Sequence, residues 1–237
     1  MKTLLEVQNL THRFQSENLF SGIHFRLMQE ESVAIVGPSG CGKSSLLRLI
    51  AGFIQPTSGF IIKDESLHGK IGFVFQEATL LPWLNVKKNI QLPLQLSGER
   101  AETDQWIQLV GLDLHTQKFP HELSGGMKMR TSIARALVLE PQLLLLDEPF
   151  SSLDENTREK LIRDFQSLQK KLHFSTLFVT HSLSEALLLA DRILILNKYG
   201  HCIGEHHPQI NRFKEKIEFT SEFQQELFQL KEAFRKT

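Results

Sequence analysis

The chain has 237 residues, of which 41% are hydrophobic, enough for one large core or two modest lobes. Lysine plus arginine and aspartate plus glutamate each number 27, so the formal net charge is zero. A protein that grips a nucleic-acid backbone usually carries a basic excess, and we therefore expect no nucleic-acid partner. The longest apolar stretches, QLLLLD and ALLLADRILIL, are short or interrupted by charge. We expect a soluble protein that reaches a membrane only through a partner.

The cysteines and the N-terminal segment indicate the compartment. Cys41 and Cys202 are far apart and lack metal-ligand spacing, which is typical of reduced thiols in a cytosolic protein. The first residues, MKTLLEVQNLTHRF, lack the apolar run of a signal peptide. We therefore expect the protein on the cytoplasmic side.

In chain order, strands come first. LLEVQNL and IHFRLMQEESVAIVG alternate apolar and polar residues and predict strands, the second ending in the apolar VAIV. GPSGCGKSS follows at once, and SSLLRLIAG has the apolar spacing of a buried helix that is closed by Gly52. KIGFVFQ is predicted to be a further strand.

From Glu77 to about Leu139 the pattern becomes helical, and strands then resume. The predicted helices are WLNVKKNIQLPLQLSG, AETDQWIQLVGL and SGGMKMRTSIARALVL. The later strands are QLLLLD, STLFVT and RILIL, separated by the helical segments TREKLIRDFQSLQKKL and LSEALLLA. This alternation predicts an α/β fold with a largely parallel sheet, into which a helical block is inserted.

A phosphate-binding loop is the strongest motif. GPSGCGKS matches G-x-x-x-x-G-K-[ST] between an apolar strand and a helix. Its glycines allow backbone N–H groups to point at phosphates, Lys43 adds a positive charge, and Ser44 offers a hydroxyl to Mg²⁺. We interpret Cys41 as filler at a position that any side chain can occupy, so alkylating it should block nucleotide entry and prior ATP should protect it. The predicted nucleotide contacts in the loop are Gly37, Pro38, Ser39, Gly40, Cys41, Gly42, Lys43, Ser44 and Ser45.

Five further residues are candidates for the nucleotide site, but each alone is a weaker signal than the phosphate-binding loop. Asp147 and Glu148 end an apolar strand and suit a Mg²⁺ shell and water activation, although such a pair is usually a solvated turn. His181 also ends an apolar strand, where a lone histidine is more often structural. Gln76, which ends the predicted strand GFVFQ, is a weaker indication of nucleotide contact than His181. Phe14, placed in a turn after the first strand, suits stacking on a nucleobase or, alternatively, a place in the core.

A second phosphate-binding pattern lies in HELSGGMKMR. A serine and two glycines stand where a helix is predicted to begin, so a hydroxyl and backbone N–H groups are available to an anion. Ser124 is expected to cap that helix.

Together, these motifs resemble the ATP-binding subunit of an ABC transporter, from about Leu4 to about Glu205. The resemblance implies a P-loop NTPase core, RecA-like, with a mainly parallel sheet, N-terminal antiparallel strands and an inserted α-helical subdomain. The implied boundaries are a single domain 1–237, with an α/β core at about 1–76 and 140–205, a helical subdomain at about 77–139 and a C-terminal helical tail at 206–237.

The resemblance also assigns roles to residues. Gly37 to Ser44 match the Walker A loop, and Leu143 to Asp147 match Walker B. The catalytic set it implies is Lys43, Gln76 of the Q-loop, Glu148 and the switch histidine His181. Phe14 would contact ATP, and the Mg²⁺ ligands would be Ser44, Gln76 and, through water, Asp147. The signature motif comprises Leu123, Ser124, Gly125, Gly126 and Met127, and the D-loop comprises Ser152, Leu153 and Asp154.

In this family two ATP-binding subunits pack head to tail, and each ATP is held by Walker A of one and the signature of the other. This explains why one chain carries two phosphate-binding patterns. The partners implied are a second ATP-binding subunit, expected to be a second copy, two transmembrane permease subunits and, indirectly, a solute-binding protein. The protein would then be peripheral at the cytoplasmic face of the plasma membrane.

The branch of the family is indicated by a departure from its common pattern. Met127 replaces the usual glutamine, and LSGGM together with LLPWLNVKKNI resembles the nitrate, sulfonate and taurine importers. Alternatives are the ATPase of an exporter or lipid-trafficking complex, or a non-transport ABC ATPase on DNA or ribosomes. The latter usually carries long coiled-coil insertions or two cassettes. A small-molecule kinase would leave the signature and His181 unexplained.

Three surface features complete the expectations. EATLLPWLNV presents an apolar set, Leu80, Leu81, Trp83 and Leu84, where the family binds a permease coupling helix, or alternatively packs these residues inside the helical block. HCIGEHH is interpreted as a surface turn rather than a metal site. The tail is predicted to place one apolar helical face on the core or on another subunit, formed by Phe219, Phe223, Leu227, Leu230 and Phe234.

Overall fold

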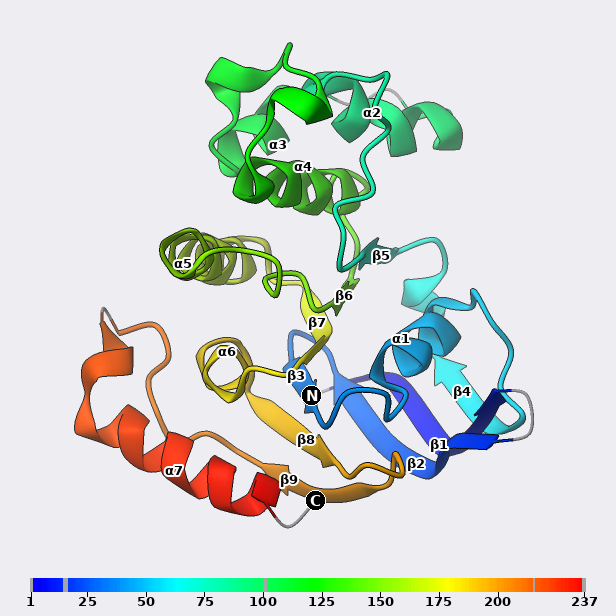
Figure 1. The fold of residues 1–237 in the computed structure, drawn as a ribbon. Coiled ribbons are helices and arrows are strands. Elements are labelled where there is room, and N and C mark those ends of the chain that lie inside the picture. The colour runs from blue at the N-terminus through cyan, green and yellow to red at the C-terminus, as the bar shows by residue number, and fades with distance from the viewer. Residues whose placement is uncertain (1, 15–16, 100–101, 215, 236–237) are drawn as a thin grey trace. The chain divides into compact units, whose positions relative to one another are not determined.

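The computed structural model describes residues 2–14, 17–99, 102–214 and 216–235 (Figure 1). The chain divides into two compact units. The first unit combines Met1–His68 with Ser175–Thr237, and the second is Gly69–Phe174. The finer boundaries predicted for a helical subdomain stay a prediction.

The first unit begins with an antiparallel sheet in the order β2-β1-β4. Its strands are β1 (Thr3–Phe14), β2 (Glu17–Met28) and β4 (Ser58–Lys63). The predicted run IHFRLMQEESVAIVG is broken into two strands by a turn in which Glu30 has a φ of 62°. The strand β3 (Ser32–Val36) follows this turn and belongs to a different sheet.

The second sheet of this unit places β3 between β7 (Ser175–Thr180) and β8 (Arg192–Leu196), all parallel. β9 (Cys202–His206) pairs antiparallel with β8. Every residue of β3 and β7 is buried, which explains their continuous apolar sequence. Because Val36 is paired with Thr180, the segments after these two strands leave the sheet side by side.

The helices of the first unit are α1 (Lys43–Ala51), α6 (Leu183–Leu189) and α7 (Ser221–Arg235), with short 3₁₀ turns η1 (Glu65–Leu67) and η4 (Ile217–Phe219). The predicted turn HCIGEHH was wrong, because Cys202–His206 forms β9. α7 packs beside α6, and His206 Nε2 of β9 lies 2.7 Å from Glu226 Oε2 of α7.

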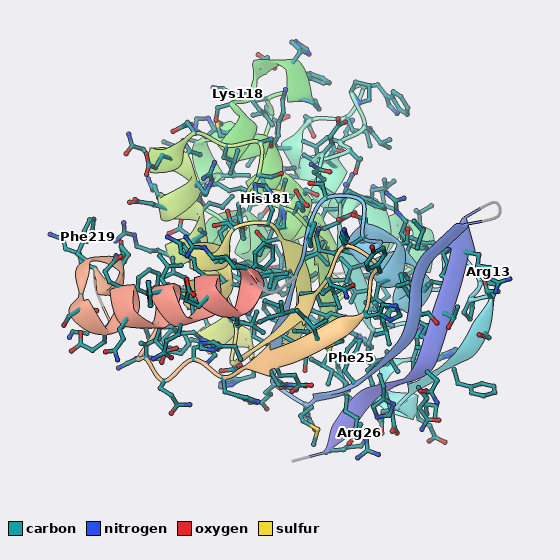
Figure 2. The ribbon with its side chains drawn as sticks, turned by 60° about the horizontal axis from the view of Figure 1, so that its bottom comes forward. Arg13, Phe25, Arg26, Lys118, His181 and Phe219 are labelled. Atoms are coloured by element: carbon teal, nitrogen blue, oxygen red, sulfur yellow. The ribbon has the colours of Figure 1, made fainter. Side chains whose placement is uncertain are left out.

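The predicted apolar face of the tail was partly wrong. Phe219 precedes α7 and is 75% exposed, and it projects beside the helix (Figure 2). The face that α7 buries is formed by Phe223, Glu226 and Leu230, whereas Leu227 is only partly covered. The carboxylate of Glu226 is tolerated there because it pairs with His206 and accepts the Gln209 N–H.

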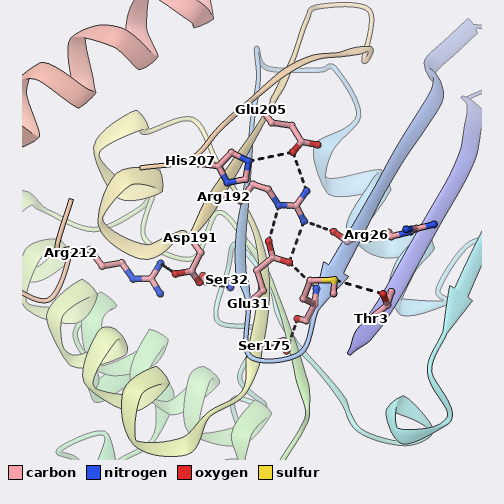
Figure 3. Close-up of polar contacts among 11 residues, drawn as sticks. Thr3, Arg26, Glu31, Ser32, Ser175, Asp191, Arg192, Glu205, His207 and Arg212 are labelled. Carbon is pink, nitrogen blue, oxygen red and sulfur yellow. Dashed lines mark hydrogen bonds and ion pairs between the residues drawn. The ribbon is translucent and has the colours of Figure 1, made fainter. Parts of the chain in front are cut away.

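A polar cluster joins the strands of the first unit at the end where β3 and β8 begin (Figure 3). Arg192 Nε donates to Glu31 Oε1 at 2.7 Å, and its Nη1 lies 3.3 Å from Glu205 Oε2. Another guanidinium N–H donates to the carbonyl of Arg26. Burial lowers the pKa of Arg192, but Glu31 outweighs it and the net shift is upward. The cluster fastens β2, β8 and β9 together.

The second unit pairs β5 (Ile71–Val74) with β6 (Leu143–Asp147) in parallel. Its helices and 3₁₀ turns are α2 (Val86–Ser97), α3 (Asp104–Leu109), η2 (Asp113–His115), η3 (Pro120–Glu122), α4 (Gly125–Leu137) and α5 (Glu155–Leu172). The predicted helices of this region are therefore present, with α2 beginning several residues later than Trp83.

The segment before α2 is held by Asn89, which is fully buried. Its amide donates to the carbonyls of Leu81 and Leu84, and its Oδ1 accepts the Leu81 N–H at 2.8 Å. Of the apolar set predicted to be exposed, only Trp83 is fully so, at 69%, whereas the three leucines are half-buried. The asparagine thus fixes the backbone of Leu81 and Leu84.

Candidate functional site

The predicted phosphate loop joins β3 to α1 in the first unit. Gly40 and Gly42 have φ values of 82° and 94°, a region that side chains with a Cβ rarely adopt. Gly42 is the N-cap of α1 and no side chain caps it, an arrangement that suits an anion at the helix N-terminus. Lys43 is buried, and its Nζ donates to the carbonyls of Gly37 and Pro38 at 2.8 and 2.9 Å.

Cys41 is not a filler position, and this interpretation was wrong. The side chain is 1% exposed, and its Sγ lies 2.9 Å from where a Cβ on Gly37 would stand. Burial raises the pKa of the Cys41 thiol. The thiol is therefore part of the packing inside the loop, and a larger or reactive group there has no open space.

His181 begins the segment after β7 and is exposed (Figure 2). Its neighbour Thr180 is buried and donates to Glu185 Oε2 at 2.6 Å, while Thr180 Oγ1 accepts the Ser182 N–H at 3.0 Å. Ser182 caps α6 by accepting the Glu185 N–H. Sequence reasoning missed this support, although the spacing of serine and glutamate in SLSE is a capping-box signal.

Asp147 and Glu148 stand at the end of β6 in the second unit. Asp147 is 3% exposed, and Glu148 is half-buried with a φ of 45°. Its carbonyl accepts both the N–H and the hydroxyl of Ser151, at 3.2 and 2.9 Å. A non-glycine residue with positive φ is uncommon, and Glu148 shares this backbone conformation with Glu30 and Glu140 of this chain.

Gln76 is exposed, two residues after β5 ends. The segment that follows it is held by Arg135 of α4, which donates to the carbonyls of Ala78 and Thr79 at 3.0 Å each. Burial lowers the pKa of Arg135. Arg135 thus ties the segment two to three residues after Gln76 to α4.

The signature motif opens α4 as expected. Ser124 is its N-cap and accepts the Met127 N–H at 3.3 Å. Leu123 is buried, whereas Ser124 and Gly125 are exposed. A Cβ on Gly126 would stand 2.5 Å from Thr157 Cγ2, so glycine is needed where α4 meets α5. Ser124 Oγ accepts this bond, and the O–H of the same hydroxyl can still donate to an external acceptor.

The D-loop leads directly into α5 in the same unit. Ser152 is exposed, Leu153 is buried, and Asp154 caps the helix by accepting the Thr157 N–H at 3.1 Å. Arg158, which sequence reasoning missed, donates to the carbonyl of Leu153 at 2.7 Å. A pocket of about 510 Å³ is lined by Ser124, Gly126 and Met127 at the start of α4, by Arg130, by Thr157, Lys160 and Asp164 of α5, and by residues 108–112 and His115.

Phe14 is the last residue of β1 rather than part of a turn, because the strand continues until it pairs with Glu17. Its side chain lies outside the described part of the structure. Among the residues that the structure does describe, no group of three His, Cys, Asp or Glu side chains is arranged to hold a metal ion. Within the same residues, no helix has the length and apolar character needed to cross a bilayer.

Comparison with known proteins agrees with this arrangement. Residues 20–151 match the family described as ABC transporter. The chain is 40% identical to an uncharacterised ABC transporter ATP-binding protein of Methanocaldococcus jannaschii, over 83% of this chain and 78% of the relative. It is also 40% identical to the spermidine/putrescine import ATP-binding protein of Nitrosomonas europaea, over 82% of this chain and 57% of the relative.

A third relative, the sulfate/thiosulfate import ATP-binding protein of Pseudomonas putida, is 39% identical over 82% of this chain and 64% of its own length. The chain therefore spans only about six-tenths of these two importer relatives. Among solved structures, a dimeric bacterial ABC transporter cassette has a TM-score of 0.76 at 29% identity, covering 86% of this chain and 98% of that one. Clostridium perfringens cbiO1, part of the complex cbiONQ, has a TM-score of 0.80 at 26% identity, covering 100% and 94%.

The α/β fold, with its N-terminal antiparallel sheet and mainly parallel second sheet, is that of an ABC cassette. The chain belongs to the ABC transporter family and is one of its ATP-binding ATPases. These findings confirm the predicted fold class and family.

Proposed function

We propose that the chain is the ATP-hydrolysing subunit of an importer, and that it dimerises on ATP to drive solute uptake through two permease subunits. The observation that carries the proposal is the pair of helix N-termini prepared for phosphate, α1 after GPSGCGKS and α4 after LSGG. A single nucleotide bound to this chain needs only the N-terminus of α1. The second suits the ATP of a partner cassette, and a related cassette has been solved as a dimer.

Nucleotide binding is assigned to the phosphate loop, from Gly37 to Ser45, with Phe14 against the base. The glycine cradle and the uncapped N-terminus of α1 fit a polyphosphate. Lys43 Nζ, which already donates to two loop carbonyls, would turn its third N–H bond to the phosphates.

Ser44, Gln76 and, through water, Asp147 would hold Mg²⁺. All three offer oxygen ligands, which suit this ion, and Asp147 is a buried carboxylate at a strand end. When bound, the ion supplies charge neutralisation to the β- and γ-phosphate oxygens.

For hydrolysis, Glu148 would orient and polarise the attacking water, while Lys43 and His181 would stabilise charge on the γ-phosphoryl group. Ser124 and Gly126 would act on the partner's ATP, with Ser152, Leu153 and Asp154 beside them. Removing one such positioned donor typically lowers the rate about 10²–10³-fold.

The cargo is proposed to be nitrate, a sulfonate or taurine. The support is the sequence LSGGM with LLPWLNVKKNI. The two importer relatives compared above carry polyamines and sulfate or thiosulfate by their names, so these solutes are the competing cargoes. The location proposed is the cytoplasmic face of the plasma membrane, with a permease helix contacting the segment around the exposed Trp83.

The test is purification of the protein from its own membranes in mild detergent, followed by identification of its partners. We expect membrane-spanning subunits, and ATPase activity that rises when a solute-binding protein loaded with taurine, an alkyl sulfonate or nitrate is added. A matched Lys43→Ala variant should lose that activity. Stimulation by sulfate or spermidine instead would overturn the cargo, membrane subunits without a binding protein would indicate export, and ribosomes or DNA would overturn transport.

A further inference from the structure

The side chain of Phe20 lies between two glycines of the first unit, one of which belongs to the phosphate loop. Phe20 is on β2 and is fully buried. A Cβ on Gly42 would stand 2.7 Å from Phe20 Cδ1, so the ring lies directly against the last glycine of the loop. A Cβ on Gly200 would stand 2.4 Å from Phe20 Cβ, so the backbone of Gly200 also packs directly against Phe20.

Gly200 belongs to the tight turn between β8 and β9, and the turn is fixed by its own hydrogen bonds. Asn197 Oδ1 accepts the N–H groups of Tyr199 and His201 at 2.9 and 3.0 Å. The His201 ring nitrogen Nδ1 lies 3.1 Å from the carbonyl of Ser21, next to Phe20. The turn is therefore anchored to β2 as well as to its own strands.

The same turn also reaches the first glycine of the loop. A Cβ on Gly37 would stand 3.0 Å from the carbonyl of Leu196 and 3.1 Å from its Cβ. Leu196 is the last residue of β8, where the turn begins. The segment Leu196–His201 thus contacts one end of the loop directly and the other end through Phe20. We name this segment, with Phe20, the brace.

Glycine-rich backbone is the most adaptable kind, so a loop containing Gly37, Gly40 and Gly42 loses much freedom when its N–H groups converge on a ligand. Contacts that already hold the loop in shape reduce that loss, and binding becomes tighter without any new contact to the ligand. The brace fixes both ends of the loop while leaving its exposed middle, Ser39 and Gly40, open to solvent.

We propose that Phe20 and Gly200 are positioning residues of the nucleotide site, and that the brace sets the curvature of the phosphate loop. The proposal rests on the nucleotide binding proposed above. Neither residue touches the nucleotide; each acts through Gly42.

The first test compares Phe20→Leu with Phe25→Leu, a control on the same strand whose side chain is also buried (Figure 2). The readouts are the Kd of the purified chain for a fluorescent ATP analogue with Mg²⁺, and the rate at which N-ethylmaleimide labels Cys41, measured by peptide mass spectrometry well below Tm. Phe20→Leu should raise Kd about 10- to 100-fold and speed Cys41 labelling, because the loop loosens. The control should change neither.

A second pair keeps the test informative if Phe20→Leu does not fold. Gly200→Ala adds a Cβ that would stand 2.4 Å from both the Leu19 carbonyl oxygen and Phe20 Cβ, whereas Gly98→Ala adds one at a similar φ, 75°, with nothing within 4 Å. Both substitutions place an alanine at a positive φ of similar size, so the backbone strain is comparable. Only Gly200→Ala should weaken nucleotide binding and expose Cys41.

Equal Kd values and equal Cys41 labelling in variant and wild type would overturn the brace. So would matching losses in a variant and its control, which would mean a general loosening of the fold. If the wild type itself did not bind the analogue, the proposed function would fail, but Cys41 labelling would still decide whether Phe20 and Gly200 shape the loop.

Discussion

Cys41 illustrates how the side chains inside the phosphate loop are packed. Burial removes its thiol from reagents, and the raised pKa leaves less thiolate at neutral pH. We expect N-ethylmaleimide to label native Cys41 at least about 10-fold more slowly than in the urea-unfolded chain, with or without Mg-ATP. Because the folded pKa is raised, this thiol favours folding below its ordinary pKa of 9.0, and the contribution is lost as pH rises further.

The measurement is peptide mass spectrometry after timed labelling near neutral pH. Cys202, which is half-buried, serves as the internal comparison in the same sample. Rapid labelling of native Cys41 that Mg-ATP prevents would contradict the packed loop and restore the idea of an open position.

The neighbour of His181 offers a second prediction at this scale. Thr180→Val removes the hydroxyl that bonds the buried Glu185, and leaves that carboxylate short of one donor. We expect a loss of about 1–3 kcal/mol in the free energy of unfolding. Because His181 is positioned by Thr180 and Ser182, kcat should fall about 10-fold as well.

The matched control is Thr176→Val on the same strand, whose hydroxyl bonds Ser32 at 2.6 Å far from His181. It should lower stability to a similar extent and leave kcat unchanged. Urea unfolding and steady-state ATPase assays give the two quantities, and equal effects on kcat would contradict a positioning role for Thr180.

Among the elements, α5 depends on the D-loop residue that begins it. The Thr157 N–H, followed by the Thr157 hydroxyl, lowers the pKa of Asp154, because both favour the charged carboxylate. A lowered native pKa stabilises the fold above the ordinary value of 3.8, and that contribution is lost as pH falls through the native pKa. Asp154→Ala should therefore lower Tm near neutral pH and have little effect in acid.

Thermal unfolding followed by circular dichroism between about pH 7 and about pH 3 tests this. Asp154→Asn is the control, because the amide oxygen still accepts the Thr157 N–H while the charge is absent. At neutral pH its Tm should fall between those of the wild type and Asp154→Ala, because only the charge-dependent part of the cap is lost, and in acid its Tm should approach that of the wild type. A difference between wild type and Asp154→Ala that persisted unchanged in acid would contradict a role for the carboxylate charge.

The sequence predicted elements well where one segment alone decides them. The helices α4 and α5 carry their own caps, Ser124 and Asp154, and a long periodic apolar face, so local pattern and structure agree. β9 was missed because its residues are only half-buried and become a strand by pairing with β8. β4 was likewise not predicted, since its mostly exposed side chains give no buried pattern.

At the scale of the whole molecule, the family and the candidate site were predictable because their motifs are contiguous and follow one another in a fixed order. The contacts that hold the phosphate loop in place could not be predicted from the sequence. Phe20 and Gly200 are far apart in the sequence, and their contact exists only once β2 and the β8–β9 turn are folded.

The oligomeric state is the prediction that belongs to the whole molecule. Glu148→Gln keeps the shape of the side chain and its unusual backbone but removes the carboxylate proposed to activate water. ATP would then persist between two copies, so light scattering after gel filtration in saturating Mg-ATP should give twice the 27.2 kDa of the chain. Without nucleotide the same variant should be monomeric.

The control adds Ser124→Ala to Glu148→Gln, which deletes the hydroxyl presented at the start of α4 without touching the phosphate loop. Each monomer should still bind ATP, yet the dimer should weaken, because Ser124 is proposed to act on the partner's nucleotide rather than its own. A Glu148→Gln chain that stayed monomeric at saturating Mg-ATP would contradict the shared site. Loss of ATP binding by the double variant's monomer would instead place Ser124 at the chain's own nucleotide.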